Sequence, residues 1–141
     1  MVHALREIWR VLRHDGVLID LRPISDRWPV EVLSSRNIQE TGRVQGLPAS
    51  LADDQAANQS MRQAAEKGWF AKEQEEFFHY DYSWDSPNEM EEYIAEEWED
   101  FIGLDEETRR ATRSMWATAD ADARVRIHAK IMIARWRRQA R

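Results

Sequence analysis

The stretch "ALREIWRVLRHDGVLIDLRP", residues 4–23, decides the fold prediction for this chain. Its first half carries apolar residues at the spacing of one helix face, namely Leu5, Ile8, Trp9 and Leu12. "HDG" ends that helix, and Gly16 is the residue that we expect to take a left-handed conformation there. The apolar run "VLIDL" then indicates a short strand covered on both faces, as in parallel sheets. Pro23 ends this strand, so the chain opens with a helix, a tight turn and a buried strand.

Length and composition are those of one globular domain, residues 1–141, with 43% hydrophobic and 33% charged residues. The chain has no cysteine, which excludes disulfides, thiolate metal sites and a cysteine nucleophile. No apolar run reaches membrane-spanning length, and the opening "MVHALREIWR" lacks the apolar region of a signal peptide. We therefore expect a cytoplasmic protein with no membrane partner.

Charge is unevenly distributed along the chain, although the net charge of −6 argues against a nucleic-acid partner. Residues 124–141 contain seven basic and no acidic residues. Residues 85–107 contain no basic residue and eleven acidic ones: Asp85, Glu89, Glu91, Glu92, Glu96, Glu97, Glu99, Asp100, Asp105, Glu106 and Glu107. These segments are either two solvated surfaces or partners that face each other within the fold or across a dimer.

The middle of the chain, residues 24–68, is expected to be an insertion or lid that lies outside the core. "WPVEVLSS" and "TGRVQGL" are two short strand-like runs that we expect to form a hairpin. Residues 49–67 are rich in Ala and Gln and poor in large apolar side chains, which indicates a weak, exposed helix. Gly68 closes that helix.

The second half of the chain predicts a strand, two helices and a final strand. "EEFFHYDYSW" alternates, which places Phe78, Tyr80, Tyr82 and Trp84 on one strand face. "SPNE" is a helix start with Ser86 as the N-cap, and a further helix follows over residues 105–119. Residues 123–136 alternate again and predict a long strand with one apolar face: Val125, Ile127, Ala129, Ile131 and Ile133.

The opening stretch resembles a late segment of class I S-adenosylmethionine-dependent methyltransferases. In that family a helix with the pattern "ALREIxRVLxxGG" leads into the fifth strand of a Rossmann-like sheet, and here His14-Asp15 stands where Pro-Gly is usual. The family continues with an insert, a sixth strand, a helix and a seventh strand antiparallel to the others. The resemblance therefore implies an α/β fold: the last three strands of a mixed parallel and antiparallel sheet, with flanking helices. Residues 24–68, 75–84, 86–102 and 123–136 fill the later places in order.

The resemblance implies S-adenosylmethionine as the cofactor, but the chain lacks the glycine-rich GxGxG loop that holds it. Its five glycines, residues 16, 42, 46, 68 and 103, form no such loop. We therefore assign no cofactor-binding residue and expect a truncated, methyltransferase-like chain. Alone, it should bind no cofactor and be inactive.

Candidate site residues come from the end of the first strand and from aromatic positions. Ligands of this fold lie beyond the carboxyl ends of strands, which makes Asp20 a candidate general base and Arg22 its neighbour. The alternative is that Asp20 caps a helix or pairs with an arginine. Candidates for stacking on a flat substrate, or else for core packing, are Trp28, Tyr80, Tyr82 and Trp84. His79 and Asp81 share a strand face, but two ligands without a distant partner are not enough to predict a metal site.

A strand that lacks its neighbour becomes an edge that invites pairing with another chain. We therefore predict a homodimer, or a partner chain, that covers the edge of residues 17–22. Three functions remain open. The chain is a methyltransferase fragment, a dimerisation or regulatory interaction module derived from one, or an unrelated α+β protein that binds a small ligand beneath the 24–68 lid.

Overall fold

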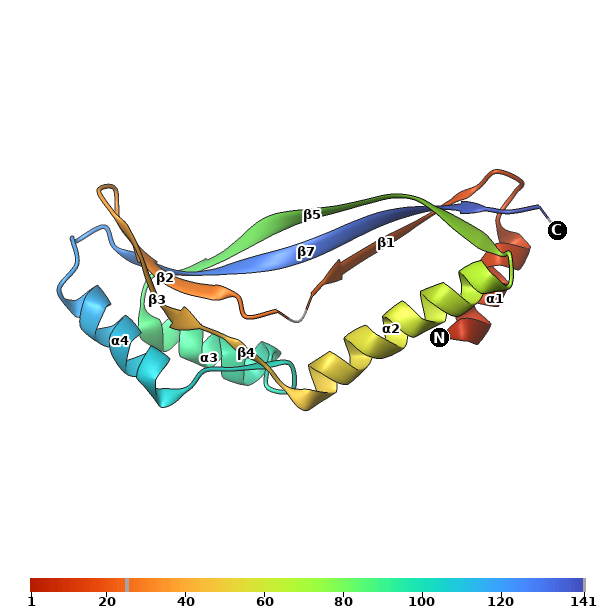
Figure 1. The fold of residues 1–141 in the computed structure, drawn as a ribbon. Coiled ribbons are helices and arrows are strands. Elements are labelled where there is room, and N and C mark those ends of the chain that lie inside the picture. The colour runs from red at the N-terminus through yellow and green to blue at the C-terminus, as the bar shows by residue number, and fades with distance from the viewer. Residues whose placement is uncertain (25, 141) are drawn as a thin grey trace. The chain divides into compact units, whose positions relative to one another are not determined.

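The computed structural model describes every residue except 25 and 141. It contains four helices among the described residues: α1 Val2–Val11, α2 Pro48–Glu66, α3 Pro87–Glu97 and α4 Glu106–Ala117 (Figure 1). The strands are β1 Val17–Pro23, β2 Pro29–Leu33, β3 Ile38–Arg43, β4 Gln45–Gly46, β5 Phe70–Trp84, β6 Ile102–Gly103 and β7 Arg124–Arg138. No helix in the described part of the chain has the length and apolar character needed to cross a membrane.

The last strand, β7, is the centre of a five-stranded sheet with the order β1-β7-β2-β3, and β5 also pairs with β7. The registers of β1 with β7, β2 with β7 and β2 with β3 are all antiparallel. A separate two-stranded sheet joins β4 and β6, again antiparallel. The protein is therefore α/β in content with a mostly antiparallel sheet, where the sequence had indicated a mixed one.

The chain divides into two compact units. Unit 1 comprises residues 1–24, 52–78 and 131–141, and unit 2 comprises residues 25–51 and 79–130. The long strands β5 and β7 contribute residues to both units.

Unit 1 has the core that the opening stretch predicts. The helix-face residue Leu5 is buried, and its three predicted companions on α1 pack against the same cluster. The helix α2, predicted to be exposed, contributes Met61 and Ala64 to this core because these two side chains face it. The cluster comprises Leu5, Met61, Ala64, Phe70, Met132, Ala134 and Trp136.

The turn between α1 and β1 differs from the prediction in which residue bends the chain. Asp15, not Gly16, has the positive φ, at 59°. Gly16 is required for space, because a Cβ there would lie 2.8 Å from the carbonyl oxygen of Arg13. Gly68, after α2, does take the left-handed conformation expected at a helix end.

Strand β1 is covered on one face only, so the prediction of burial on both faces is wrong. Paired residues of an antiparallel sheet share a face, and Leu18, Asp20 and Arg22 lie opposite Trp136, Ala134 and Met132 of the unit 1 core. On the other face Ile19 is 52% exposed and Leu21 is 58% exposed. Residues of α1 and α2 pack in the core on the first face of β1 within unit 1, and the second face is exposed among the described residues.

Unit 2 builds its core from the segment predicted to be a lid. The hairpin of β2 and β3 forms as expected. However, Trp28, Val30 and Val44 are buried against α3 and β7, so this part of residues 24–68 is core. The cluster comprises Trp28, Val30, Val44, Met90, Ile94, Ile102, Leu104, Val125, Ile127 and Ala129, and Tyr82, Trp84, Trp98 and Trp116 pack on it.

Two capping residues fix the helices of unit 2. Ser86 is the N-cap of α3 as predicted, since its hydroxyl accepts a hydrogen bond from the backbone N–H of Glu89 at 3.3 Å. The carboxylate of Asp105 caps α4 through the N–H of Thr108 at 2.7 Å. This hydrogen bond lowers the pKa of Asp105 below its usual value.

The predicted single apolar face of β7 holds for only part of the strand. In unit 2 the odd-numbered residues from Val125 to Ala129 enter the core. In unit 1 the even-numbered residues from Met132 to Trp136 do so. Ile131 and Met132 are both buried at the point of change. The alternation of buried residues that holds within each core is therefore interrupted at Ile131 and Met132.

Candidate functional site

The Asp20 and Arg22 candidates form an ion pair at the carboxyl end of β1. The guanidinium of Arg22 donates from Nε and Nη2 to the two carboxylate oxygens of Asp20 at 2.8 and 3.0 Å. Its Nη2 also donates to the side-chain oxygen of Asn58 on α2 at 3.0 Å. Both ionic side chains are mostly buried. Asp20 is thus held by an arginine, which was the alternative to a general base.

A cavity of about 180 Å³ adjoins this ion pair within unit 1. Its walls come from the end of β1, from α2, from β5 and from β7, in the region where the fold class predicted a ligand. The lining residues are Arg22, Ile24, Asp54, Asn58, Glu75, Phe77 and Met132.

The aromatic candidates do not gather around Asp20. Trp28 is buried in the unit 2 core, and Tyr82 and Trp84 pack on that core against Trp98, at ring-centroid distances of 4.6 and 6.2 Å. Burial raises the pKa of the Tyr82 phenol. Tyr80 is 54% exposed and meets Tyr82 edge to face at 4.9 Å. Of the four candidates, Tyr80 offers the most ring surface for stacking.

His79 and Asp81 belong to a polar row that the sequence did not predict in full. The ring of His79 stacks on the ring of His128 at 4.0 Å, and His128 Nδ1 lies 2.5 Å from a carboxylate oxygen of Asp81. Arg126 continues the row, since it binds Glu31 at 2.6 Å and approaches Asp81 at 3.5 Å. No three His, Cys, Asp or Glu side chains in the described residues are grouped so as to hold a metal ion.

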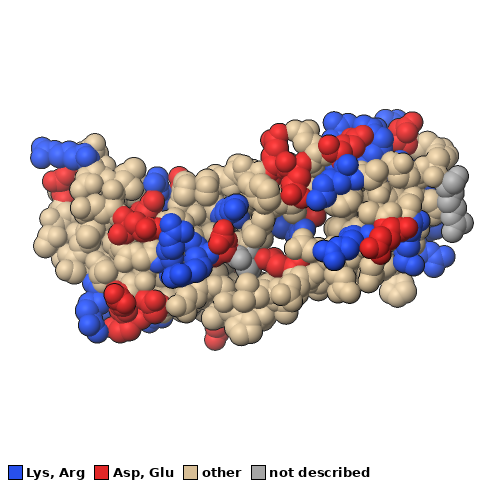
Figure 2. Space-filling model, viewed as in Figure 1, with Lys and Arg blue, Asp and Glu red and all other residues tan. Residues whose placement is uncertain are grey.

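The acidic and basic segments meet through one ion pair among the described residues, between Asp85 and Arg124 at 3.1 Å. Most of the other basic side chains of β7 bind carboxylates outside residues 85–107, whereas Arg138 donates to the carbonyl oxygen of Trp9. Glu73 on β5 binds both Arg135 and Arg137, and the hydrogen bond from Arg137 lowers the pKa of Glu73. Figure 2 shows acidic and basic side chains interspersed on the face that it displays. The acidic segment, residues 85–107, and the basic segment, residues 124–141, therefore do not pair with each other as two continuous surfaces.

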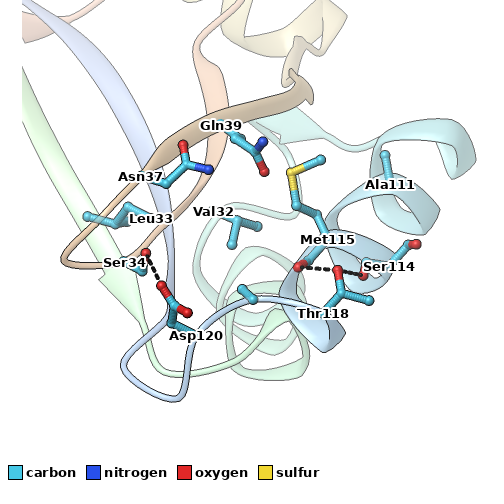
Figure 3. Close-up of a pocket in the computed structure, with 11 residues that line it drawn as sticks. Val32, Leu33, Ser34, Asn37, Gln39, Ala111, Ser114, Met115, Thr118 and Asp120 are labelled. Carbon is cyan, nitrogen blue, oxygen red and sulfur yellow. Dashed lines mark hydrogen bonds between the residues drawn. The ribbon is translucent and has the colours of Figure 1, made fainter.

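A larger cavity of about 530 Å³ lies in unit 2 between the β2–β3 hairpin and α4 (Figure 3). Its side chains are mainly apolar, hydroxyl or carboxamide groups, and its single charged residue is Asp120, which accepts a hydrogen bond from Ser34 at 3.2 Å. The lining residues are Val32, Leu33, Ser34, Asn37, Gln39, Ala111, Ser114, Met115, Thr118, Ala119 and Asp120.

This cavity exists because α4 touches the hairpin closely at its first turns and less closely afterwards. Thr108 and Thr112 are buried against β3, and the hydroxyls of Thr112 and Thr41 are 2.7 Å apart. A Cβ on Gly42 would lie 2.2 Å from the hydroxyl oxygen of Thr108, so only glycine permits this approach. On the helix side the cavity is lined by Ala111 and, further along α4, by Ser114 and Met115.

The free edge of β1 is a second kind of candidate site. Among the described strands, β1 pairs with β7 alone. Its register of seven consecutive pairs contains no bulge, and Asp20, its one acidic residue, is bound by Arg22. Bulges, exposed charges and prolines are the usual means of protecting an edge, and on β1 only Pro23 at the end of the strand serves in this way, so the edge from Val17 to Leu21 is unprotected. On the open face, a cavity of about 200 Å³ extends away from this edge and is lined by Ile19, Gln74, Glu76, Ile133 and Arg135.

Comparisons with protein-family models, with curated proteins and with solved structures found no match to this chain.

Proposed function

We propose that this chain is an interaction module, related to the C-terminal half of class I S-adenosylmethionine-dependent methyltransferases, that pairs with another polypeptide through β1. The order of elements supports this relation, because α1, β1, an insert, β5, α3 and β7 occur in the sequence that the resemblance implies. The last strand is antiparallel to β1, as the seventh strand of that family is to the fifth.

The observation that carries the docking proposal is the uncovered edge and face of β1. Ile19 and Leu21 are more than half exposed on a strand whose other face is packed. In an α/β sheet with helices on both faces such residues would be buried. In this proposal a partner strand pairs with the free edge of β1 and places its own apolar side chains beside Ile19 and Leu21, and the simplest partner is a second copy.

The resemblance also implies a Rossmann-like sheet and S-adenosylmethionine as the cofactor. We propose that the chain contributes to such a sheet but does not bind the cofactor by itself. The 141 residues contain no GxGxG loop, so no cofactor-binding role is assigned to them. In this account the chain supplies the last strands of the sheet, and methyl transfer is not its own activity. The proposed location is the cytoplasm, in keeping with the lack of cysteine.

Sedimentation equilibrium of the wild-type chain and two variants tests this function. Leu21→Lys places a charge on the edge of β1, where Leu21 is 58% exposed. Ile38→Lys is the control, because it places the same charge on β3 at a side chain that is 57% exposed. We expect the wild-type chain and Ile38→Lys to associate and Leu21→Lys to sediment as a monomer. Equal association of all three, or a monomeric wild-type chain with no partner at β1, would refute the proposal.

A second candidate function is favoured by the cavity beside α4. The carboxamides of Asn37 and Gln39 line it, and their side chains make no hydrogen bond within the described residues. Its size falls in the range of small-molecule sites, and it offers no cation to an anionic ligand. We propose an uncharged ligand with an apolar body and an amide-like edge. Methyl NMR of Met115 during titration with nicotinamide tests this, because Gln39→Leu should abolish any shift.

A further inference from the structure

We infer that the partner at β1 is a second copy of this chain, paired antiparallel about a two-fold axis centred on Ile19. This inference rests on the proposed docking function of β1 and adds the partner and the register to it.

The hydrogen bonds to β7 determine which backbone groups of β1 face outward. The N–H of Arg138 donates to the carbonyl oxygen of Gly16 at 2.8 Å, so Gly16 faces β7. Successive residues of a strand direct their N–H and C=O groups to alternate sides. Because the register continues without a break, the even-numbered residues face β7 and the odd-numbered residues face the free edge. The outward residues are Val17, Ile19, Leu21 and Pro23.

Only Val17, Ile19 and Leu21 offer both a donor and an acceptor at this edge, because proline has no N–H. A symmetric antiparallel pairing that uses all three must be centred on the middle one. Ile19 then exchanges two hydrogen bonds with its own copy, and each Val17–Leu21 pair exchanges two more. The six bonds satisfy every outward N–H of the strand.

The side chains fit the same register. Directly paired residues share a face, so the pairs formed on the open face are Ile19 with Ile19 and Val17 with Leu21, which are apolar throughout. On the covered face Asp20 lies opposite Leu18 of the second copy, and its carboxylate is already bound by Arg22.

The neighbouring registers are less favourable for specific reasons. Centring on Asp20 pairs Val17 with Pro23, and the missing N–H of proline leaves each Val17 carbonyl without a donor. It also places the two Asp20 carboxylates directly opposite each other, with one Arg22 bound to each. Centring on Leu21 pairs Ile19 with Pro23, and the missing N–H leaves each Ile19 carbonyl without a donor. The register centred on Ile19 is therefore the one in which the backbone groups and the side chains of this edge are both matched.

Disulfide cross-linking tests this register cleanly, because the chain has no cysteine of its own. In the inferred dimer Ile19→Cys lies opposite its copy at a Cα separation of about 5.5 Å, which a disulfide spans. Leu21→Cys lies about 14 Å from its copy, because the two are offset by four residues. We expect Ile19→Cys to cross-link into a covalent dimer on mild oxidation, and Leu21→Cys to do so at least about tenfold more slowly.

Two further variants complete the test. The double variant Val17→Cys with Leu21→Cys should cross-link, since these positions face each other, and Ile38→Cys on the edge of β3 should not. If Leu21→Cys cross-links faster than Ile19→Cys, the register is wrong although the docking edge stands. If the wild-type chain is a monomer yet Leu21→Lys abolishes its binding to another chain, the second copy is wrong and the docking function survives. Loss of both would refute the proposed function itself.

Discussion

The close approach of α4 to the β2–β3 hairpin gives a sharp prediction at Gly42. A Cβ there would lie 2.2 Å from Oγ1, 2.6 Å from Cγ2 and 2.8 Å from Cβ of Thr108. Thr108 is 4% exposed and lies in the first turns of a capped helix, so its side chain has no space to move into. Gly42→Ala must therefore push α4 away from β3.

The cost of this substitution follows from overpacking in a filled region. Such changes destabilise a protein by about 1–3 kcal/mol. At about 4 °C per kcal/mol for a chain of this size, the thermal midpoint should fall by roughly 4–12 °C. Urea denaturation measures the free energy of unfolding. If its slope against urea concentration is the same in the variant and the wild-type chain, the folded and unfolded states have kept their compactness.

A second substitution separates this clash from a general intolerance of alanine. Thr108→Ala removes the two nearest atoms and leaves the Cβ at 2.8 Å, so Gly42→Ala should cost at least about 1 kcal/mol less in that background. Costs that agree within about 0.5 kcal/mol in the two backgrounds would mean that the residues do not interact and that the packing described here is wrong.

Three other predictions concern the turn, the cap and the cofactor. Asp15 has a φ of 59°, so Asp15→Val should be less stable than Asp15→Gly by about 1–2 kcal/mol in urea denaturation. The pKa of Asp105 is lowered by the N–H of Thr108. The ionised Asp105 carboxylate therefore stabilises the fold fully above the unfolded-state pKa of about 3.9, and this stabilisation is lost as the pH falls through the lower folded-state pKa. Asp105→Asn keeps the capping oxygen but does not ionise, so the thermal midpoint of this variant should depend less on pH over this acidic range. If the midpoint depends on pH as steeply as in the wild-type chain, Asp105 is not a cause of the acid destabilisation. Calorimetric titration with S-adenosylhomocysteine should give no one-to-one binding, and micromolar binding would mean that a cofactor site exists without the glycine loop.

Local sequence signals predicted local structure well in this chain. The helix face that includes Leu5, the N-cap at Ser86 and the hairpin of β2 and β3 all depend on residues close together in sequence. The edge position of β1 was predicted as well, and among the described strands β1 pairs with β7 alone.

Features that depend on distant residues were not predictable in this way. The burial of Val30 and Val44 depends on α3 and β7, and nothing in their own segment separates them from a lid. The change of buried face at Met132 depends on the chain building two cores. His128 and Asp81 lie on different strands, so their contact depends on how β7 pairs with β5. The alternation of β7 indicated only which face of that strand His128 occupies.

The candidate site residues were chosen for their places on strands, and the structure shows what surrounds each of them. Asp20 and Arg22 do adjoin a cavity, because the end of a strand is a natural place for one. Trp28 was drawn into the core because a large aromatic side chain stabilises the fold most when it is buried. The cavity beside α4 has no signature in sequence, since it arises from the spacing of a helix against a hairpin.

Residue-resolved amide exchange in β1 is the measurement that tests the central claim most directly. In the wild-type chain at high concentration, the outward N–H groups of Val17, Ile19 and Leu21 should exchange slowly, and in Leu21→Lys the first two should exchange rapidly. The inward N–H groups of Leu18, Asp20 and Arg22 should stay protected in both, because β7 binds them. Rapid exchange of the outward N–H groups in the wild-type chain at every concentration would mean that β1 is a bare edge, and the account would be wrong.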